Sequence, residues 1–247
     1  MKQQKNNSKV TISPYWEKYK FPCGPITIKF EGLSHTVKQP TVENLKDLEV
    51  EFPDQTMVDS MGEIKTSKNM DVKRKLALWN MIIQDAAGYF TEGDKPDTWK
   101  ASIPPLHKLG VINEVNRIKT VSKDDIAAHF LPDLVMKVSP TLVNIYGVAN
   151  NNGSPQPLAF QFIQPTEESL EKYIDITTMQ QRMKNKHFYL SGKPHSQGLV
   201  ELFDLLIDQV IGYDTNEPYA IPSLHKIVAV TELFSQMTES LREAEGN

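Results

Sequence analysis

The chain has 247 residues, of which 39% are hydrophobic and 23% charged, with a net charge of −4; this composition excludes wholesale disorder and predicts a folded globular protein. No apolar run approaches the roughly 18 residues of a membrane span, and residues 1–8 lack the apolar segment of a signal peptide, so we expect a cytoplasmic protein without a membrane partner. The lone Cys23 excludes an internal disulfide framework and a cysteine-based metal site.

The first predicted segment is an N-terminal arm, residues 1–24. It contains Tyr15, Trp16, Tyr19 and Phe21 among prolines and lysines and shows no clean period. Because aromatic side chains give large contact areas at interfaces, these four residues are our candidate partner contacts. The alternative is that they fold back over their own domain.

Residues 25–120 form the first predicted module, which begins with a β-hairpin. Alternating apolar and polar residues in ITIKF lead to a turn at Glu31-Gly32 and a return strand. Thr41 then caps a short helix. Apolar residues at three- and four-residue steps between positions 72 and 90 predict a long central helix, and a last helix starts at Pro104.

A structured connector, residues 121–140, is expected to lead into a second module, residues 141–247. Its predicted hairpin pairs TLVNIYGV with PLAFQFIQ, and Thr166 begins the short helix. A central helix is expected over positions 199–210, and a last helix starts at Pro222. The expected fold class is therefore α+β, a tandem repeat of a β-hairpin followed by about three helices, helix-rich overall.

The repeat rests on three blocks that recur in the same order. The matching blocks are PTVENL (40–45) with PTEESL (165–170), WNMIIQDAAGYF (79–90) with FDLLIDQVIGYD (203–214), and IPPLHKL (103–109) with IPSLHKI (221–227). The offsets are 125, 124 and 118 residues. Blocks that keep their order with small insertions between them predict a tandem duplication.

No pattern of residues predicts a catalytic site, a cofactor or a metal ion. His107 and His225 occupy matching places in Leu-His-Lys, but neither belongs to a His-Glu-x-x-His or similar cluster, so we interpret both as structural. Ser223 and Lys226 match a Ser-x-x-Lys spacing without the other motifs of serine-lysine enzymes. The sequence also lacks the glycine-rich phosphate loops of common nucleotide-binding proteins.

Charge is divided unevenly along the chain. Residues 1–120 carry 18 Lys and Arg against 15 Asp and Glu, a net of +3, whereas residues 121–247 carry 9 against 16, a net of −7. Neither value predicts nucleic acid binding, and we interpret the basic clusters at 73–75 and 182–187 as solvated helix faces. The asymmetry favours a charged partner or head-to-tail self-association, although ordinary surface variation also explains it.

One combination of elements has a counterpart in a known family. The segments ITIKFEGLSHTVKQPTVENLKDLE (26–49) and, more loosely, PLAFQFIQPTEESLEKY (157–173) resemble the small tail assembly chaperones of tailed bacteriophages and related tail or baseplate assembly proteins. The duplication and the length depart from the simplest members and suit a baseplate-hub assembly factor better. The resemblance implies a non-enzymatic role in holding or placing another phage protein, and it transfers no catalytic residues.

We therefore predict a non-enzymatic protein-binding factor of phage tail or baseplate assembly, acting in the host cytoplasm on protein partners. Two alternatives stay open: a permanent structural component of a virion or another complex, and an enzyme with a site between the two modules. Polar, titratable residues converging between the modules would favour the enzyme, and a dry apolar seam would count against it.

Overall fold

The computed structural model describes residues 20–53, 55–58, 64–66, 68–91, 93–120, 141–148, 155–178, 180–184, 187–191 and 194–244. Within these residues the fold is α+β, with seven α-helices and three antiparallel sheets. The predicted connector at 121–140 lies outside the described residues. No helix in the described ranges is long and apolar enough to cross a membrane.

The first half begins with the predicted hairpin and adds a returning strand to it. Glu31 and Gly32 have φ angles of 50° and 82°, the backbone that a two-residue hairpin turn requires. Its elements are β1 (Ile26–Phe30), β2 (Leu33–Val37), α2 (Val42–Glu51), β3 (Gln55–Val58), β4 (Ile64–Thr66), α3 (Lys68–Ile82), β5 (Ile83–Ala87), α4 (Trp99–Ser102), α5 (Pro105–Val115) and β6 (Lys119–Thr120). The first sheet has the strand order β1-β2-β5.

The second half follows the same order of elements. Its elements are β7 (Leu142–Val148), β8 (Pro155–Phe162), α7 (Glu167–Thr177), β9 (Gln180–Lys184), β10 (His187–Ser191), α8 (Ser196–Leu206), β11 (Ile207–Ile211), the 3₁₀ turn η2 (Pro218–Ala220) and α9 (Ser223–Ala244). The second sheet has the order β11-β8-β7-β6, so a strand from the end of the first half completes it.

Local details also recur at matching places. Thr41 and Thr166 each accept a hydrogen bond from the backbone N–H three residues on, at 3.3 Å in both helices. Gly88 and Gly212 both have φ near +90°, and each precedes a tyrosine whose hydroxyl contacts the Nδ1 atom of a histidine. The matching order, pairing and hydrogen bonds belong to the structure; the duplication that would explain them stays a prediction.

The predicted central helices end earlier than the apolar spacing suggested. Helix α3 ends at Ile82 and α8 at Leu206, and after each helix the chain continues as a strand that pairs with the hairpin of the same half. Both pairings contain a register shift, and on β5 the buried residues Ile83 and Ala86 are therefore three positions apart. A bulged strand thus imitates helical spacing. On α5, the last helix of the first half, Leu106 is 75% exposed.

Two hydrophobic cores correspond to the two halves. The first is centred on Trp79 and Ile82, both fully buried, and the second on Phe160, Phe203 and neighbouring side chains. Leu224 at the start of α9 packs against the first core, so the last helix touches both.

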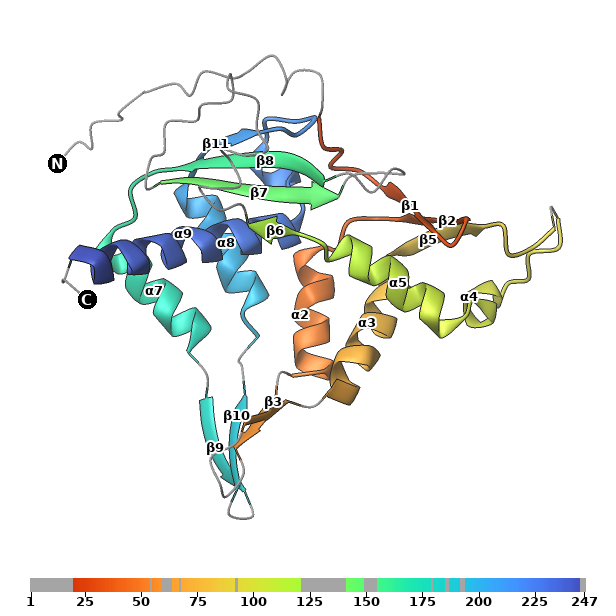
Figure 1. The fold of residues 1–247 in the computed structure, drawn as a ribbon, viewed down its shortest axis with the longest axis horizontal. Coiled ribbons are helices and arrows are strands. Elements are labelled where there is room, and N and C mark those ends of the chain that lie inside the picture. The colour runs from red at the N-terminus through yellow and green to blue at the C-terminus, as the bar shows by residue number, and fades with distance from the viewer. Residues whose placement is uncertain are drawn as a thin grey trace.

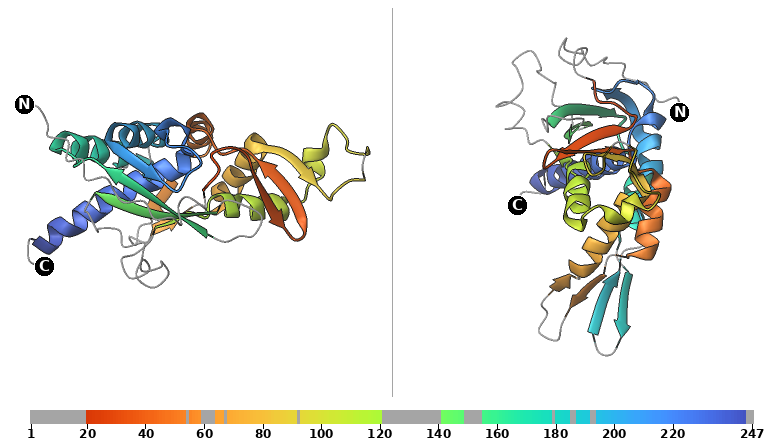
Figure 2. Two further views of the ribbon diagram at one scale, coloured as in Figure 1. Left: turned by 90° about the horizontal axis from the view of Figure 1, so that it is seen from above. Right: turned by 90° about the vertical axis from the view of Figure 1, so that its right-hand side faces the viewer.

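A third sheet is made jointly by the two halves and was not predicted. The hairpin β3-β4 of the first half pairs with the hairpin β9-β10 of the second through β3 and β10, which gives the order β4-β3-β10-β9. It projects from the body of the molecule (Figures 1 and 2). Of the basic cluster at 182–187, Arg182 and Lys184 lie on β9 and His187 lies on β10, which corrects our interpretation of a helix face, whereas the cluster at 73–75 lies on α3.

Four helices stand above the projecting sheet in a matching row. Contacts join α7 to α8, α8 to α2, and α2 to α3, so α7 and α3 are the outer helices of the row (Figure 1). The outer helices continue into the outer strands, because β9 follows α7 and β4 precedes α3. The inner helices are connected to the inner strands in the same way.

Candidate functional site

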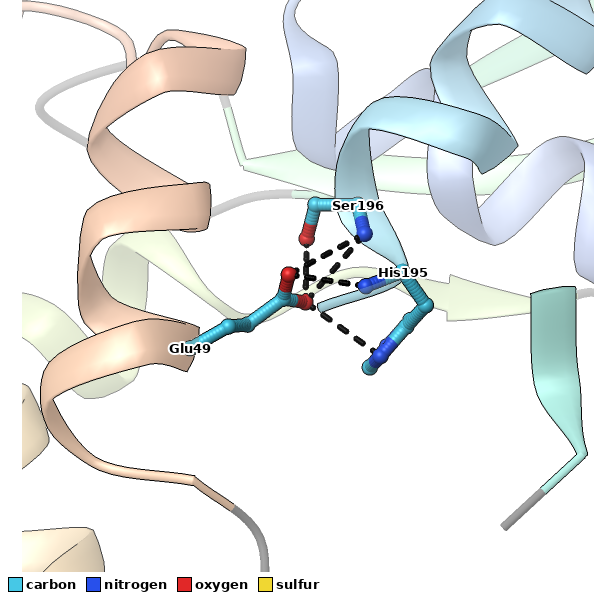
Figure 3. A network of polar contacts seen from close by, with 3 residues as sticks. All are labelled: Glu49, His195 and Ser196. Atoms are coloured by element: carbon cyan, nitrogen blue, oxygen red, sulfur yellow. Dashed lines mark hydrogen bonds and ion pairs between the residues drawn. The ribbon is translucent and has the colours of Figure 1, made fainter. Parts of the chain in front are cut away.

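Polar and titratable side chains converge where α2 meets the start of α8 (Figure 3). Glu49, near the end of α2, is only 5% exposed. Its carboxylate accepts hydrogen bonds from the backbone N–H groups of His195 at 2.9 Å and Ser196 at 3.2 Å, and from the Ser196 hydroxyl at 2.6 Å. The His195 Nδ1 atom lies 3.3 Å from the same carboxylate.

This carboxylate caps a helix that is distant in the sequence. The first N–H groups of an α-helix have no partner within the helix, and His195, the residue before α8, makes no side-chain cap of its own. Glu49 supplies the acceptor from the other half of the chain, and its negative charge complements the positive end of the helix dipole. We call the contacts of α2 and β3 with β10 and α8 the joint.

A second contact lies beside the carboxylate. The Nζ atom of Lys46, one turn earlier on α2, donates to the Gln197 side-chain oxygen at 2.9 Å. Together with the pairing of β3 and β10, these contacts link the halves through side chains and backbone.

Serine, histidine and glutamate are also the residue types of a nucleophilic triad, so the geometry decides between the two roles. In a triad the histidine stands between the serine and the carboxylate. Here the Ser196 hydroxyl donates directly to Glu49, and Ser196 is 4% exposed. The arrangement therefore differs from a triad, because no histidine stands between Ser196 and the carboxylate and the serine is buried. Its contacts join the two halves.

An open depression of about 440 Å³ lies next to the joint, between α7 and the start of α8. Its lining comprises Glu168, Glu171, Lys172, Asp175, Ile176, Pro194 and Gly198. Three carboxylates and one amine give it an acidic character. In the described residues no group of three or more His, Cys, Asp or Glu is arranged to hold a metal ion.

A separate polar chain crosses the first half. The Tyr89 hydroxyl contacts Nε2 of His35 at 2.9 Å and Nδ1 of His107 at 2.7 Å, and Nε2 of His107 lies 3.2 Å from Glu31. Burial, followed by the electrostatic effect of the neighbouring His107 ring, lowers the pKa of His35 to about 4. His35 Nδ1 and Trp79 Nε1 are buried without a hydrogen-bond partner among the described residues.

In the second half an apolar residue, Phe160, occupies the position that corresponds to His35. The ring centroids of Phe160 and Tyr213 are 5.8 Å apart, and those of His35 and Tyr89 in the first half are 5.4 Å apart. Phe160 also packs edge-on against Phe203. Burial lowers the pKa of His225, which bonds to Tyr213, to about 3. The common feature of the two halves is thus a hydrogen bond between a tyrosine that follows the third strand and a histidine near the start of the last helix.

For the candidate partner contacts of the arm, the structure places only Phe21. It is 1% exposed and packs edge-on against Tyr213 and His225. Backbone bonds join it to Gly212 and Asp214, so it extends the core of the second half. Phe21 is therefore not an exposed contact, and the alternative that it folds back is the correct one for this residue. Tyr15, Trp16 and Tyr19 lie outside the described residues.

The sequence reasoning missed Glu49, His195 and Ser196. A signal existed on α2, because Leu45, Leu48 and Glu49 share the buried face and an acidic residue on such a face needs a partner. The partner itself lies 147 residues away, beyond the reach of any local pattern.

Comparisons with protein-family models, with curated proteins and with solved structures found no match.

Proposed function

We propose that the protein is a non-enzymatic protein-binding factor that acts in phage tail or baseplate assembly. The observation that supports this role is the projecting sheet, which both halves build together and whose outer strands are β4 and β9. The outer strands of a sheet present backbone N–H and C=O groups to a further strand, and strand addition is a common mode of protein recognition.

The resemblance of residues 26–49 and 157–173 to tail assembly chaperones supplies the biological context of the proposal. A factor of this kind holds or places another phage protein and uses contacts in place of bond-breaking chemistry. The buried joint fits such a role, since it fixes the two hairpins in one sheet and so presents them as a single surface.

Mass spectrometry of particles from the native source tests this proposal. We expect the protein in tail or baseplate assembly intermediates and not in finished particles. Its presence in finished particles at a fixed ratio would replace the proposal with the alternative of a permanent component. Its absence from both would refute a role in assembly.

An enzyme with a site between the halves is the second candidate, favoured by the convergence of titratable side chains at the joint. That candidate predicts turnover of a phosphoester, peptide or glycoside substrate that Ser196→Ala abolishes while the urea unfolding midpoint changes little. Activity of this kind at enzyme-like rates would overturn the binding proposal. We expect Ser196→Ala to lower stability and to affect no reaction.

A further inference from the structure

We propose that copies of this chain associate head to tail by repeating, between molecules, the joint that links the two halves within one molecule. The inference rests on the proposed function and deepens it, because it names a second copy of the chain as one of the binding partners.

The direction of the joint makes such repetition possible. Within the chain, the helix-strand unit α2-β3 of the first half meets the strand-helix unit β10-α8 of the second half. The corresponding units that remain are α7-β9 of the second half and β4-α3 of the first half. They lie at opposite ends of the helix row and of the sheet (Figure 1). One molecule therefore carries both parts of a second, equivalent joint, and only another copy can bring them together.

Strand directions agree with this assembly. All neighbours in the sheet β4-β3-β10-β9 are antiparallel. A β4 strand placed beside β9 in the same alternation is again antiparallel, so the sheet continues from one molecule to the next without a reversal.

The side chains at the equivalent positions are exposed and apolar. The offset of 125 residues that relates the two Thr-capped helices places Ile174 where α2 has Glu49. The offset of 124 that relates α3 to α8 places Val72 where α8 has Ser196. Ile174 is 52% exposed and Val72 is 43% exposed, and both are among the few large hydrophobic residues exposed in the described part of the chain. The buried polar pair of the joint thus corresponds to an exposed apolar pair at the two ends.

The second contact of the joint has a charged equivalent. Lys46 and Gln197, which share a hydrogen bond at 2.9 Å, correspond to Glu171 and Lys73, and both of these side chains are exposed. In the proposed assembly a glutamate of one copy therefore faces a lysine of the next. The surroundings agree, since Glu171 lies in the acidic depression along α7 and Lys73 belongs to the basic cluster on α3. The net charges of the halves, −7 and +3, have the same opposition.

The two contacting surfaces differ, so the interface is heterologous. Such an interface produces a closed ring if the rotation between copies closes and a growing filament if it does not.

Sedimentation velocity of the purified full-length protein tests the proposal. We expect the wild type to form rings or longer assemblies as its concentration rises. Glu171→Lys alone and Lys73→Glu alone should each shift the protein to monomer, because like charges then meet at every contact. An equimolar mixture of the two variants should assemble again, since every contact then pairs opposite charges. Ile174→Asp should also yield monomer.

Matched controls separate these effects from general changes in charge and folding. Lys29→Glu on β1 changes the net charge as Lys73→Glu does, and Leu106→Asp on α5 removes an exposed leucine; both should assemble like the wild type. Circular dichroism should show that every variant is folded. A wild type that stays monomeric at all concentrations, or a mixture that fails to assemble, would overturn head-to-tail association. These measurements use this protein alone and no other partner. A negative result would therefore refute self-association only, and the proposed function would still be tested by mass spectrometry of the particles.

Discussion

Replacing Glu49 with alanine removes the carboxylate that holds the joint together. Three hydrogen bonds at the start of α8 depend on it, and those to Ser196 are buried. A buried donor left without a partner costs about 1–3 kcal/mol, and loss of a helix N-cap costs about 0.5–2 kcal/mol. The two ranges describe the same hydrogen bonds and are not added. Because water can reach the partly exposed His195, only the two Ser196 donors are left buried, and at the lower part of the first range we expect the free energy of unfolding to fall by about 2–3 kcal/mol.

Urea unfolding followed by two signals measures this loss and locates it. In a Trp16→Phe background the remaining tryptophans, Trp79 and Trp99, both belong to the core of the first half, so fluorescence follows that half, while far-ultraviolet circular dichroism follows both. In the wild type the two transitions should coincide, because the joint couples the halves. In Glu49→Ala they should separate.

Glu51→Ala is the matched control, since Glu51 is an exposed residue at the end of the same helix. Its unfolding free energy should change by at most about 0.5 kcal/mol. Ser196→Ala should cost about 1 kcal/mol, because it removes one hydrogen bond of Glu49 and keeps the two backbone bonds. If Glu49→Ala is no more destabilising than Glu51→Ala and its transitions coincide, the joint does not couple the halves and our reasoning is refuted.

Three further predictions concern the two cores and the single thiol. The folded protein lowers the pKa of His35 from 6.5 to about 4 and that of His225 from 6.5 to about 3. Below pH 6.5 the unfolded chain therefore binds protons that the folded protein does not bind. The full stability is present above pH 6.5, and part of it is lost as the pH falls to about 4 for His35 and about 3 for His225. For His35 the loss is about 3 kcal/mol, and His35→Phe should flatten the pH dependence of the urea midpoint above pH 4. Trp79→Ala should cost about 3–5 kcal/mol in the same titration, because the ring is fully buried; a normal midpoint would contradict its place in the core. Burial and then Asp214 raise the pKa of Cys23 to about 12, so an aromatic disulfide reagent at pH 8 should react roughly a hundredfold or more slowly with the folded than with the urea-unfolded protein, and equal rates would contradict this.

Elements with local signals could be predicted, and elements decided by distant pairing could not. The hairpin of β1 and β2 follows from alternation and a Glu-Gly turn, and the starts of α2 and α7 follow from a capping threonine. Strands β5 and β11 were assigned to helices because their apolar residues continue the spacing of α3 and α8; on β5 a bulge places the buried residues Ile83 and Ala86 three positions apart. The strands of the projecting sheet are three to five residues long, and β3 is paired across the chain with β10, which no local pattern reports.

The candidate site divides in the same way. The Tyr-His pairs were visible as matching blocks, because each lies within one half and both halves carry it. Glu49 and Ser196 have no matching block: the positions that correspond to them hold Ile174 and Val72. The contacts specific to the joint are therefore made at positions where the two halves carry different residues.

The different chemistry of the joint and of its proposed counterpart between molecules follows from how long each contact must last. A buried carboxylate loses its hydration, and only hydrogen bonds that are always present offset that loss. The partners of Glu49 belong to the same chain, so they are always present. A contact between copies forms and breaks, and a charged residue buried there would contribute little net affinity. Burial of the exposed parts of Ile174 and Val72 contributes about 1–2 kcal/mol for each side chain. The Glu171 and Lys73 pair at its edge then selects the correct orientation, since charges that remain near water influence specificity more than strength. A polar joint within the chain and an apolar, charge-edged one between chains are thus what the same geometry requires in the two situations.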